Sequence, residues 1–332
     1  MKKISSHEKN NRGGDLDGFA GGIDEEADLS VRAAWLHFGG GLTQSEVAAR
    51  LGVPPVKAHR LIARAKSMGV VHVTIDGPIG ACIALEQRLT NQYGLSFCQV
   101  APDLEDDPLP LRTLGLVGSR FLSRALLSGE HEVIGFGHGR TLAACVTMLP
   151  QMSAPGVKLV SLLGGLSRRY ATTPFDVIHR LAERTGAEAY VLPLPFYANT
   201  IEDRAVLLEQ RGVQPIMAMG IGATLRLVGI GTMEADASIL STGMAEEEEF
   251  EEARRAGGVG EVLGHIFGAE GQVIESGLSA RALSMPVEEI GRQTTIAIAG
   301  GKSKIAPIKA ALASGLIRGL ITDERTAKTL TA

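Results

Sequence analysis

The chain has 332 residues, of which 45% are hydrophobic and 21% are charged, and its formal net charge is −4. This length is too great for one small module and suits two domains. No run of about 18 apolar residues occurs, and the polar N-terminus lacks an apolar signal core, so we expect a cytosolic protein without a membrane-spanning helix. The three cysteines and the scattered histidines show no metal-ligand spacing, so we expect buried thiols and no metal site.

The first residues of the chain differ in composition from the rest. Residues 1–27 are glycine-rich, charged and almost without large apolar side chains, which predicts a disordered tail. A helix is expected over about residues 28–38. Four of its apolar residues share one helical face and are expected to be buried: Val31, Ala34, Trp35 and Phe38.

A helix-turn-helix pattern follows in residues 42–66. Thr43 and Glu46 fit a capping box, in which each residue's side chain accepts from the other's backbone amide. Gly52 supplies the left-handed residue that ends this short helix. Pro55 then suits the first turn of a second helix, where a missing amide costs nothing.

The second helix has an apolar face and a basic face. The apolar face is expected to be buried and contains Ala58, Leu61, Ile62 and Ala65. Residues at the start of such a helix reach base edges in the major groove of DNA. The residues expected to contact DNA are therefore Thr43, Gln44, Pro55, Lys57, His59, Arg60 and Arg64. The alternative is an ordinary amphipathic helix with a solvated basic face.

The charge of this segment supports the first interpretation. Residues 28–76 hold six Lys or Arg side chains against three acids, a net charge of +3, whereas the whole chain carries −4. Positive charge is thus concentrated where phosphate contacts would be needed. A strand at 70–75 is typical of a small wing. We therefore place a winged-helix-like DNA-binding domain at 28–76 and a linker at 77–84.

From residue 85 to residue 332 apolar strands alternate with helices. The expected strands are 97–101, 132–136, 157–163, 189–192, 218–219 with 226–230, 295–299 and 319–322. The expected helices are 109–127, 141–149, 173–185, 202–211 and 304–314. Such alternation predicts a Rossmann-like α/β domain with a mostly parallel sheet covered on both faces. Ligands of such sheets bind at the carboxyl ends of the strands.

One strand-to-helix turn, in VIGFGHGRTL, has the chemistry of a ligand site. Gly137 and Gly139 let the backbone approach a ligand, with His138 between them. Arg140 adds a positive charge and Thr141 a hydroxyl at a helix N-terminus, which suits an anion or a polyhydroxylated group. The glycine spacing is wrong for a dinucleotide fingerprint, so no cofactor is expected. The alternative is a tight turn without a ligand.

Further glycine-rich turns follow later strands. They lie at 164–165, 231, 258–260 and 300–301. Loops after several strands of one sheet can converge on a single pocket. The Gly301-Lys302-Ser303 triplet is not a P-loop, because the required upstream glycine position holds Ile296.

These segments carry a family resemblance that runs from about residue 29 to residue 330. The motifs are LTQSEVAARLGVPPVKAHRLI, GFGHGRTL, LLGGLS, PFYANTIED, VGIGTM, GGVGEVLGHIF and AIAGGKSKIAPIKAALASGLIRGLITDERTA. The chain resembles SorC-type transcriptional regulators, also grouped with DeoR-type sugar-responsive regulators. The resemblance implies an effector domain similar to sugar-phosphate isomerases and deaminases. It also implies a homodimer or homotetramer whose operator binding is controlled by a sugar, sugar phosphate or polyol.

Within this family the chain is most similar to erythritol-type regulators, in RAAWLHFGGGLTQ and VKAHRLI. Phosphate-binding members often carry a threonine pair in the first glycine loop. This chain has a single threonine there, so a neutral polyol is also a candidate effector. Glu261 and Lys304 match effector-contacting acidic and basic positions of the family. The residues expected to bind the effector are Gly137, His138, Gly139, Arg140, Thr141, Gly164, Gly165, Asn199, Glu261 and Lys304.

Two classes of function compete on this fold, which alone does not separate them. One is a ligand-controlled repressor or activator of a carbohydrate or polyol operon. The other is an enzyme acting on sugar phosphates, which would need a general base near the carbonyl carbon. Glu261 and His138 could take that role, but no strong pair emerges. Because the basic helix would serve no purpose in an enzyme, we predict a regulator without catalytic residues.

Overall fold

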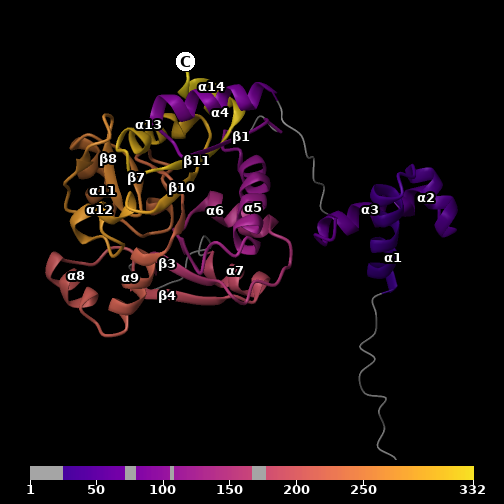
Figure 1. Ribbon diagram of the computed structural model, residues 1–332, viewed down its shortest axis with the longest axis horizontal. Helices are drawn as coiled ribbons and strands as arrows, with labels where there is room; N and C mark the ends of the chain where they lie inside the picture. The colour runs from indigo at the N-terminus through magenta and orange to yellow at the C-terminus, as the bar shows by residue number, and fades with distance from the viewer. Residues whose placement is uncertain (1–24, 72–79, 105–107, 167–176) are drawn as a thin grey trace, which may run out of the picture. The chain divides into compact units, whose positions relative to one another are not determined.

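The computed structural model describes residues 25–71, 80–104, 108–166 and 177–332. The chain divides into two compact units, one ending at residue 75 and the other beginning at residue 76 (Figure 1). Each unit has its own hydrophobic core, and we describe them separately.

The described residues of the N-terminal unit, 25–71, form three helices. They are α1 (Glu25–Ala34), continued by the π-helical turn η1 (Trp35–Gly39), α2 (Gln44–Leu51) and α3 (Pro55–Ser67). The predicted capping box is confirmed, since Thr43 N donates to Glu46 Oε2 at 2.8 Å and Glu46 N donates to Thr43 Oγ1 at 3.3 Å. Gly52 ends α2 with φ of 65°. The predicted apolar face of α3 is buried.

The buried face of the first helix is not the predicted one. Of the four residues expected to be buried, Ala34 is buried, but Val31, Trp35 and Phe38 are 41%, 68% and 40% exposed. The buried residues are Ser30, Ala33, Ala34 and Leu36. Ser30 can lie in the core because its hydroxyl donates to the carbonyl of Glu26 at 2.6 Å. After Ala34 the π-helical turn adds a residue to the turn and shifts the phase of the helix.

The borders of this unit also differ from the prediction. Helix α1 includes the last three residues of the expected tail, and residues 1–24 lie outside the described residues. The expected wing is described only at residues 70–71, which form no strand. Residues 80–84 of the expected linker belong to α4 (Gly80–Tyr93), because Cys82, Leu85 and Leu89 give this helix a buried face.

The second unit contains a seven-stranded parallel sheet, which confirms the predicted fold class. Its strands are β1 (Phe97–Ala101), β2 (Val133–Phe136), β3 (Lys158–Leu166), β4 (Glu188–Pro195), β5 (Leu225–Val228), β10 (Thr294–Ile298) and β11 (Gly319–Asp323). Their spatial order is β1-β11-β10-β5-β2-β3-β4. The chain runs outward from β2 in one direction and from β5 in the other, so the sheet has a topological switch point between these two strands.

Helices cover both faces of this sheet. One face packs against α5 (Leu111–Leu127), α6 (Arg140–Met148) and α7 (Ile178–Thr185) (Figure 1). The other face carries α4, α9 (Val213–Gly222), α13 (Ile305–Ala313) and α14 (Glu324–Leu330). The remaining helical segments of this unit's described residues are α8 (Ile201–Leu208), α10 (Ser238–Ser241), α11 (Glu247–Arg255), α12 (Val287–Ile290), η2 (Ser279–Arg281) and η3 (Lys302–Lys304).

A second, antiparallel sheet was not predicted. It consists of β6 (Gly231–Thr232), β7 (Gly258–Val262), β8 (His265–Gly268) and β9 (Val273–Ile274). The glycine-rich segment expected to be a turn at 258–260 is therefore part of strand β7. The strand expected at 218–219 was also wrong, since these residues lie in α9. A short apolar run does not by its periodicity distinguish a strand from a buried helix.

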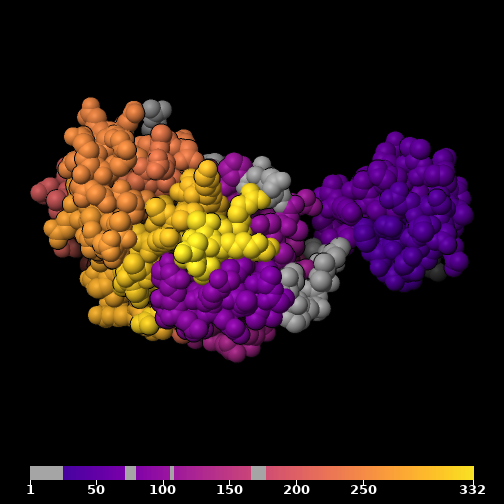
Figure 2. Space-filling view, turned by 90° about the horizontal axis from the view of Figure 1, so that it is seen from above, coloured from indigo at the N-terminus to yellow at the C-terminus, as the bar shows by residue number. Residues whose placement is uncertain are grey.

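Helix α4 packs along the C-terminal helix α14, where Figure 2 shows the two segments side by side. Gln92 Nε2 donates to the carbonyl of Leu330 at 3.4 Å. On the sheet side, Glu86 Oε1 accepts from Val100 N at 2.8 Å. These contacts fix α4 to both the sheet edge and the C-terminal helix.

Arg226, in the middle of β5, is fully buried and connects the sheet to the helices beside it. Its guanidinium donates to the carbonyls of Gly220 and Ile221 at the end of α9. It also donates to the carbonyls of Glu289, at 2.7 Å, and Ile290, at 3.3 Å, at the end of α12. One side chain thus connects two helix ends to the sheet, and it adds a charged donor to four carbonyls, three of which also accept from other groups.

We expect Arg226→Met to lower the free energy of unfolding by about 3 kcal/mol or more, because four carbonyls at two helix ends would lose a charged donor. Urea unfolding followed by circular dichroism would show this as a lower midpoint. Arg124→Met is the matched control, since Arg124 is exposed on α5. A midpoint for Arg226→Met equal to that of the control would contradict this role.

Candidate functional site

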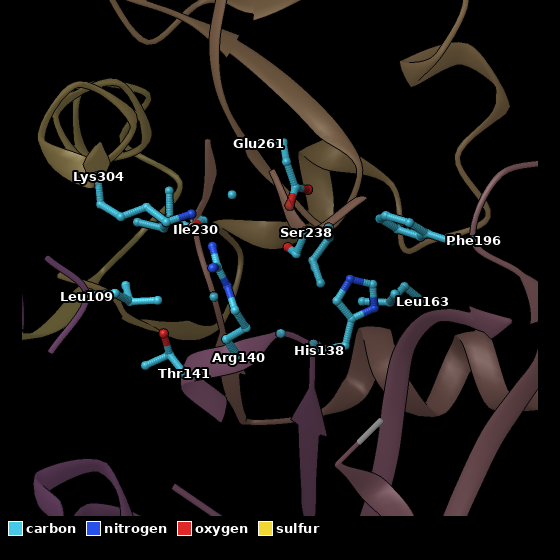
Figure 3. Close-up of a pocket in the computed structure, with 15 residues that line it drawn as sticks. Leu109, His138, Arg140, Thr141, Leu163, Phe196, Ile230, Ser238, Glu261 and Lys304 are labelled. Carbon is cyan, nitrogen blue, oxygen red and sulfur yellow. Dashed lines mark hydrogen bonds between the residues drawn. The ribbon is translucent and has the colours of Figure 1, made fainter. Parts of the chain in front are cut away.

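A cavity lies at the switch point of the parallel sheet, between the loops that follow β2 and β5 (Figure 3). Its volume is about 40 Å³, space on the order of three water molecules. The lining residues are Leu109, Gly137, His138, Gly139, Arg140, Thr141, Leu163, Phe196, Gly229, Ile230, Gly231, Ser238, Glu261, Leu263 and Lys304. Both sheets and several helix starts therefore contribute to one small polar site.

Two glycines of the cavity are required by its geometry. Gly139, with φ of 126°, precedes α6 in a conformation that other residues rarely adopt. Gly231 lies opposite Glu261, where an added Cβ would be 2.3 Å from the Oε1 atom. Glycine at 231 therefore leaves the space that the carboxylate occupies.

Glu261 extends from β7 into the cavity and is 7% exposed. Its Oε2 atom accepts from Gly264 N at 2.8 Å. Burial raises the pKa of the Glu261 carboxyl, while the Gly264 amide and the Lys304 ammonium oppose this shift. The carboxyl group thus keeps an oxygen facing the cavity, where it can accept a hydrogen bond.

Lys304, at the end of η3, supplies a buried amine, and its side chain is also 7% exposed. Its Nζ atom donates to the carbonyl of Ile230 at 2.7 Å. Burial lowers the pKa of Lys304 to about 8, and Glu261 partly opposes this effect. Because an ammonium has three donors, two remain for a ligand or water.

His138 stands inside the cavity beside Phe196, with the two rings edge to face and their centroids 4.9 Å apart. Its Nδ1 atom is enclosed and has no hydrogen-bond partner among the described residues. Burial lowers the pKa of His138 to about 4, so the ring is neutral at pH 7. An unpartnered buried nitrogen is costly, so a ligand that supplies the missing hydrogen bond would gain affinity.

Arg140 and Thr141 begin α6 and point into the same cavity (Figure 3). Both are partly buried. The guanidinium donates only, whereas the hydroxyl can donate or accept. Together with Glu261 and Lys304, these groups offer donors and acceptors on several sides of a small ligand.

The second candidate surface is on α3, in the N-terminal unit. His59 and Arg60 are exposed, and Lys57 is partly buried. Arg64 pairs with Glu26 of α1 at 2.7 Å, so α1 occupies part of the predicted basic face. Arg60 lies 3.8 Å from the same carboxylate, but its side chain remains 72% exposed.

The other predicted DNA contacts lie at the helix starts. Thr43 uses its side chain in the capping box, and Gln44 and Pro55, the first residues of α2 and α3, are exposed. Sequence reasoning missed Val56, which is 81% exposed in the first turn of α3. A side chain of this kind can contact the methyl group of thymine. Its signal was available, because Val56 falls outside the apolar spacing of the helix.

Comparisons with known proteins identify the family. Residues 77–332 match the family described as "Putative sugar-binding domain". The chain is 54% identical, over 92% of its length and 97% of the relative, to the erythritol catabolism regulatory protein EryD of Brucella abortus (strain 2308). The chain belongs to the SorC family of sugar-binding transcriptional regulators.

Other relatives agree with this assignment. Transcriptional regulator LsrR of Enterobacter sp. (strain 638) is 33% identical over 95% of this chain and 96% of its own length. The crystal structure of the full-length sorbitol operon regulator SorC from Klebsiella pneumoniae matches with a TM-score of 0.70 and 26% identity, covering 92% of this chain and 98% of that one. Because these relatives are transcriptional regulators, they confirm the regulator interpretation over the enzyme.

Within this SorC-family regulator, the structure brings seven predicted effector residues to the cavity. They are Gly137, His138, Gly139, Arg140, Thr141, Glu261 and Lys304. No helix in the described part of the chain is long and apolar enough to cross a membrane. The described residues also contain no cluster of His, Cys, Asp or Glu that could hold a metal ion.

Three predicted residues lie elsewhere in the regulator. Gly164 and Gly165 do not line the cavity. At Gly164 an added Cβ would be 2.1 Å from the carbonyl of Pro195, so this glycine serves close packing of β3 on β4. Asn199 lines a separate cavity of about 230 Å³ beside α8. The neighbouring residue Leu163 lines the cavity, where the prediction had placed Gly164.

The low pKa of His138 in this SorC-family regulator generates a prediction for stability. The pKa of His138 is lower in the folded protein, at about 4, than its ordinary value of 6.5. As pH falls below 6.5 the unfolded state takes up the proton first, so stability is lost. Between pH 7.5 and pH 5 this loss should be about 2 kcal/mol.

His138→Asn should remove this component, which urea unfolding of both proteins across the pH range would measure. Subtracting the free energy of unfolding of the variant from that of wild type at each pH removes the contributions of the titrating groups that both proteins have. His179→Asn is the control, because His179 is exposed on α7. Parallel curves for His138→Asn and wild type would show that the ring is not held neutral.

Proposed function

We propose that this chain is a DNA-binding regulator of polyol catabolism, whose operator affinity is set by a small neutral polyol bound in the switch-point cavity. The observation that carries the proposal is the convergence of His138, Arg140, Glu261 and Lys304 on one small cavity in a SorC-family chain. The EryD relative is named for erythritol catabolism. A four-carbon polyol is therefore the first effector to test.

The chemistry of the cavity favours a neutral polyol over a phosphate ester. A phosphate dianion accepts hydrogen bonds only, so Arg140 and Lys304 can donate to it, whereas the Glu261 carboxylate has no hydrogen to share with it and repels it. A hydroxyl can donate to Glu261 or to His138 Nδ1 and accept from Arg140 or Lys304. A cavity of about 40 Å³ has to widen for either ligand, and it has to widen less for a four-carbon polyol than for a six-carbon phosphate.

Control of DNA binding requires that the effector favours one arrangement of the regulator, since a ligand with equal affinity for two states shifts nothing. The regulator would act in the cytosol as a homodimer or homotetramer. One helix-turn-helix reads a short half-site, and symmetric pairing doubles its contacts and sets the half-site spacing.

The effector site can be tested with two conservative variants. Thr141→Val and Glu261→Gln should bind operator DNA like wild type, but the effector concentration at half response should rise about tenfold or more, because each removes a buried hydrogen bond. Gel-shift titrations with erythritol, its stereoisomers, longer polyols and their phosphates would measure this.

Asn199→Ala is the matched control, because Asn199 lines the separate cavity. It should leave the half-response concentration unchanged. Thermal shifts of wild type with the same compounds give an independent readout, about 2.7 kcal/mol of stabilisation at 100 times the dissociation constant. Wild-type midpoints in both cavity variants would place the effector elsewhere.

The DNA surface can be tested on an operator selected in vitro from random duplexes with the wild-type chain. Lys57→Ala/Arg60→Ala should weaken specific binding by about 1–3 kcal/mol if Arg60 reads a base. If both side chains contact phosphate instead, the plot of log binding constant against log salt concentration should become less steep, by the equivalent of about two phosphate contacts. Arg88→Ala/Arg124→Ala, with the same change of charge on exposed helices of the second unit, should bind normally. Unchanged affinity of the Lys57/Arg60 variant would exclude this surface.

A further inference from the structure

One apolar stripe of the DNA-binding unit is left uncovered. Val31, Trp35 and Phe38 fall at i, i+4 and i+7 along α1 and η1, and they are 41%, 68% and 40% exposed. Trp35 is the only tryptophan of the chain. Isolated exposed apolar residues are ordinary, but a contiguous stripe centred on a tryptophan is typical of an interface.

The π-helical turn produces this stripe. Gly40 N donates to the carbonyl of Trp35 at 2.9 Å, five residues back, which widens the last turn of the helix. Leu36 stays in the core of the unit, while Trp35 points outward. When a π-helical turn interrupts a regular helix, it often does so at a functional site.

The charges beside the stripe indicate what covers it. The first turn of α1 is acidic, with Glu25, Glu26 and Asp28. Glu26 pairs with Arg64 of α3, but Glu25 and Asp28 form no ion pair among the described residues. These acids oppose an approach of DNA phosphates to the stripe. At the other end of the stripe, Lys66 Nζ lies over the Phe38 ring, 5.0 Å from its centroid.

We propose that this stripe joins the DNA-binding units of two copies of the chain, with their α1 helices antiparallel about a two-fold axis. The inference rests on the proposed operator binding. Val31 of one copy would pack against Trp35 of the other, which places the axis at the level of residue 33. Asp28 then lies five residues from the axis, about 7.5 Å along the helix.

Phe38 lies five residues from the axis on the other side, so Asp28 of each copy faces Phe38 and Lys66 of the other. The acidic and basic ends of the stripe are therefore complementary, and the two-fold axis makes this contact twice. The pairing is self-complementary without any further partner.

Three side chains are far fewer than the roughly 20–30 residues a side of a stable interface. The pairing is therefore weak by itself. It forms when two copies are held together on one operator, where the effective concentration of one unit near the other reaches the millimolar range. The stripe then fixes the distance between two α3 helices rather than the affinity of free chains.

The fluorescence of Trp35 tests this directly, because no other tryptophan contributes. In the complex of the full chain with the two-half-site operator selected in vitro, Trp35 should be shielded from acrylamide, with emission shifted to the blue. Asp28→Lys should expose it again and weaken binding to the full operator about three- to tenfold, since two ion pairs become repulsive. Asp28→Lys/Lys66→Glu restores the charge pairing and should restore both shielding and affinity.

A duplex with one half-site is the control, because it needs only one DNA-binding unit. It should bind wild type, Asp28→Lys and Asp28→Lys/Lys66→Glu with similar affinity once the salt dependence of each protein's binding is taken into account. Trp35 fully open to acrylamide in the wild-type operator complex would overturn the proposal. Shielding that persists unchanged in Asp28→Lys would also overturn it, because another segment or the DNA would then cover the stripe. Failure of wild type to select any duplex would instead reject operator binding.

Discussion

The order of strands in the parallel sheet is the constraint on which the effector site depends. Because the chain leaves β2 and β5 in opposite directions, the loops after these strands separate and leave a crevice at their carboxyl ends. Gly137–Thr141 borders it on one side and Gly229–Gly231 on the other. Loops from more distant strands and from the second sheet only complete a site whose position the sheet has already determined.

The second sheet makes this crevice polar. Strand β7 pairs with β6 so that Glu261 lies opposite Gly231, and η3 brings Lys304 to the same place. Each charged group already has one protein partner, the Gly264 amide for Glu261 and the Ile230 carbonyl for Lys304. These hydrogen bonds hold the side chains in place before a ligand arrives, so less side-chain order has to be gained on binding.

The sequence predicted the features that depend on local pattern. The capping box at Thr43, the apolar face of α3 and most strands of the parallel sheet follow from spacing of two to four residues. The features that failed depend on tertiary packing. The π-helical turn at Trp35 shifted a buried face, Gly164 proved to serve the packing of β3 on β4, and β6–β9 pair over distances that short patterns do not report. Val56 falls outside the apolar spacing of α3, and this signal was overlooked.

The loop before η3, beside the cavity, is hydrogen-bonded to α14, which packs against α4. Gly301, beside η3, donates its amide to Thr326 Oγ1 at 2.8 Å, and Thr326 Oγ1 donates to Asp323 Oδ2 at 2.6 Å. Thr326 lies in α14, which packs against α4. Lys304 therefore lines the cavity from a loop that is hydrogen-bonded to α14, and α14 contacts α4, the first described helix after residue 76. Such contacts transmit a signal only if they have two arrangements that the ligand distinguishes.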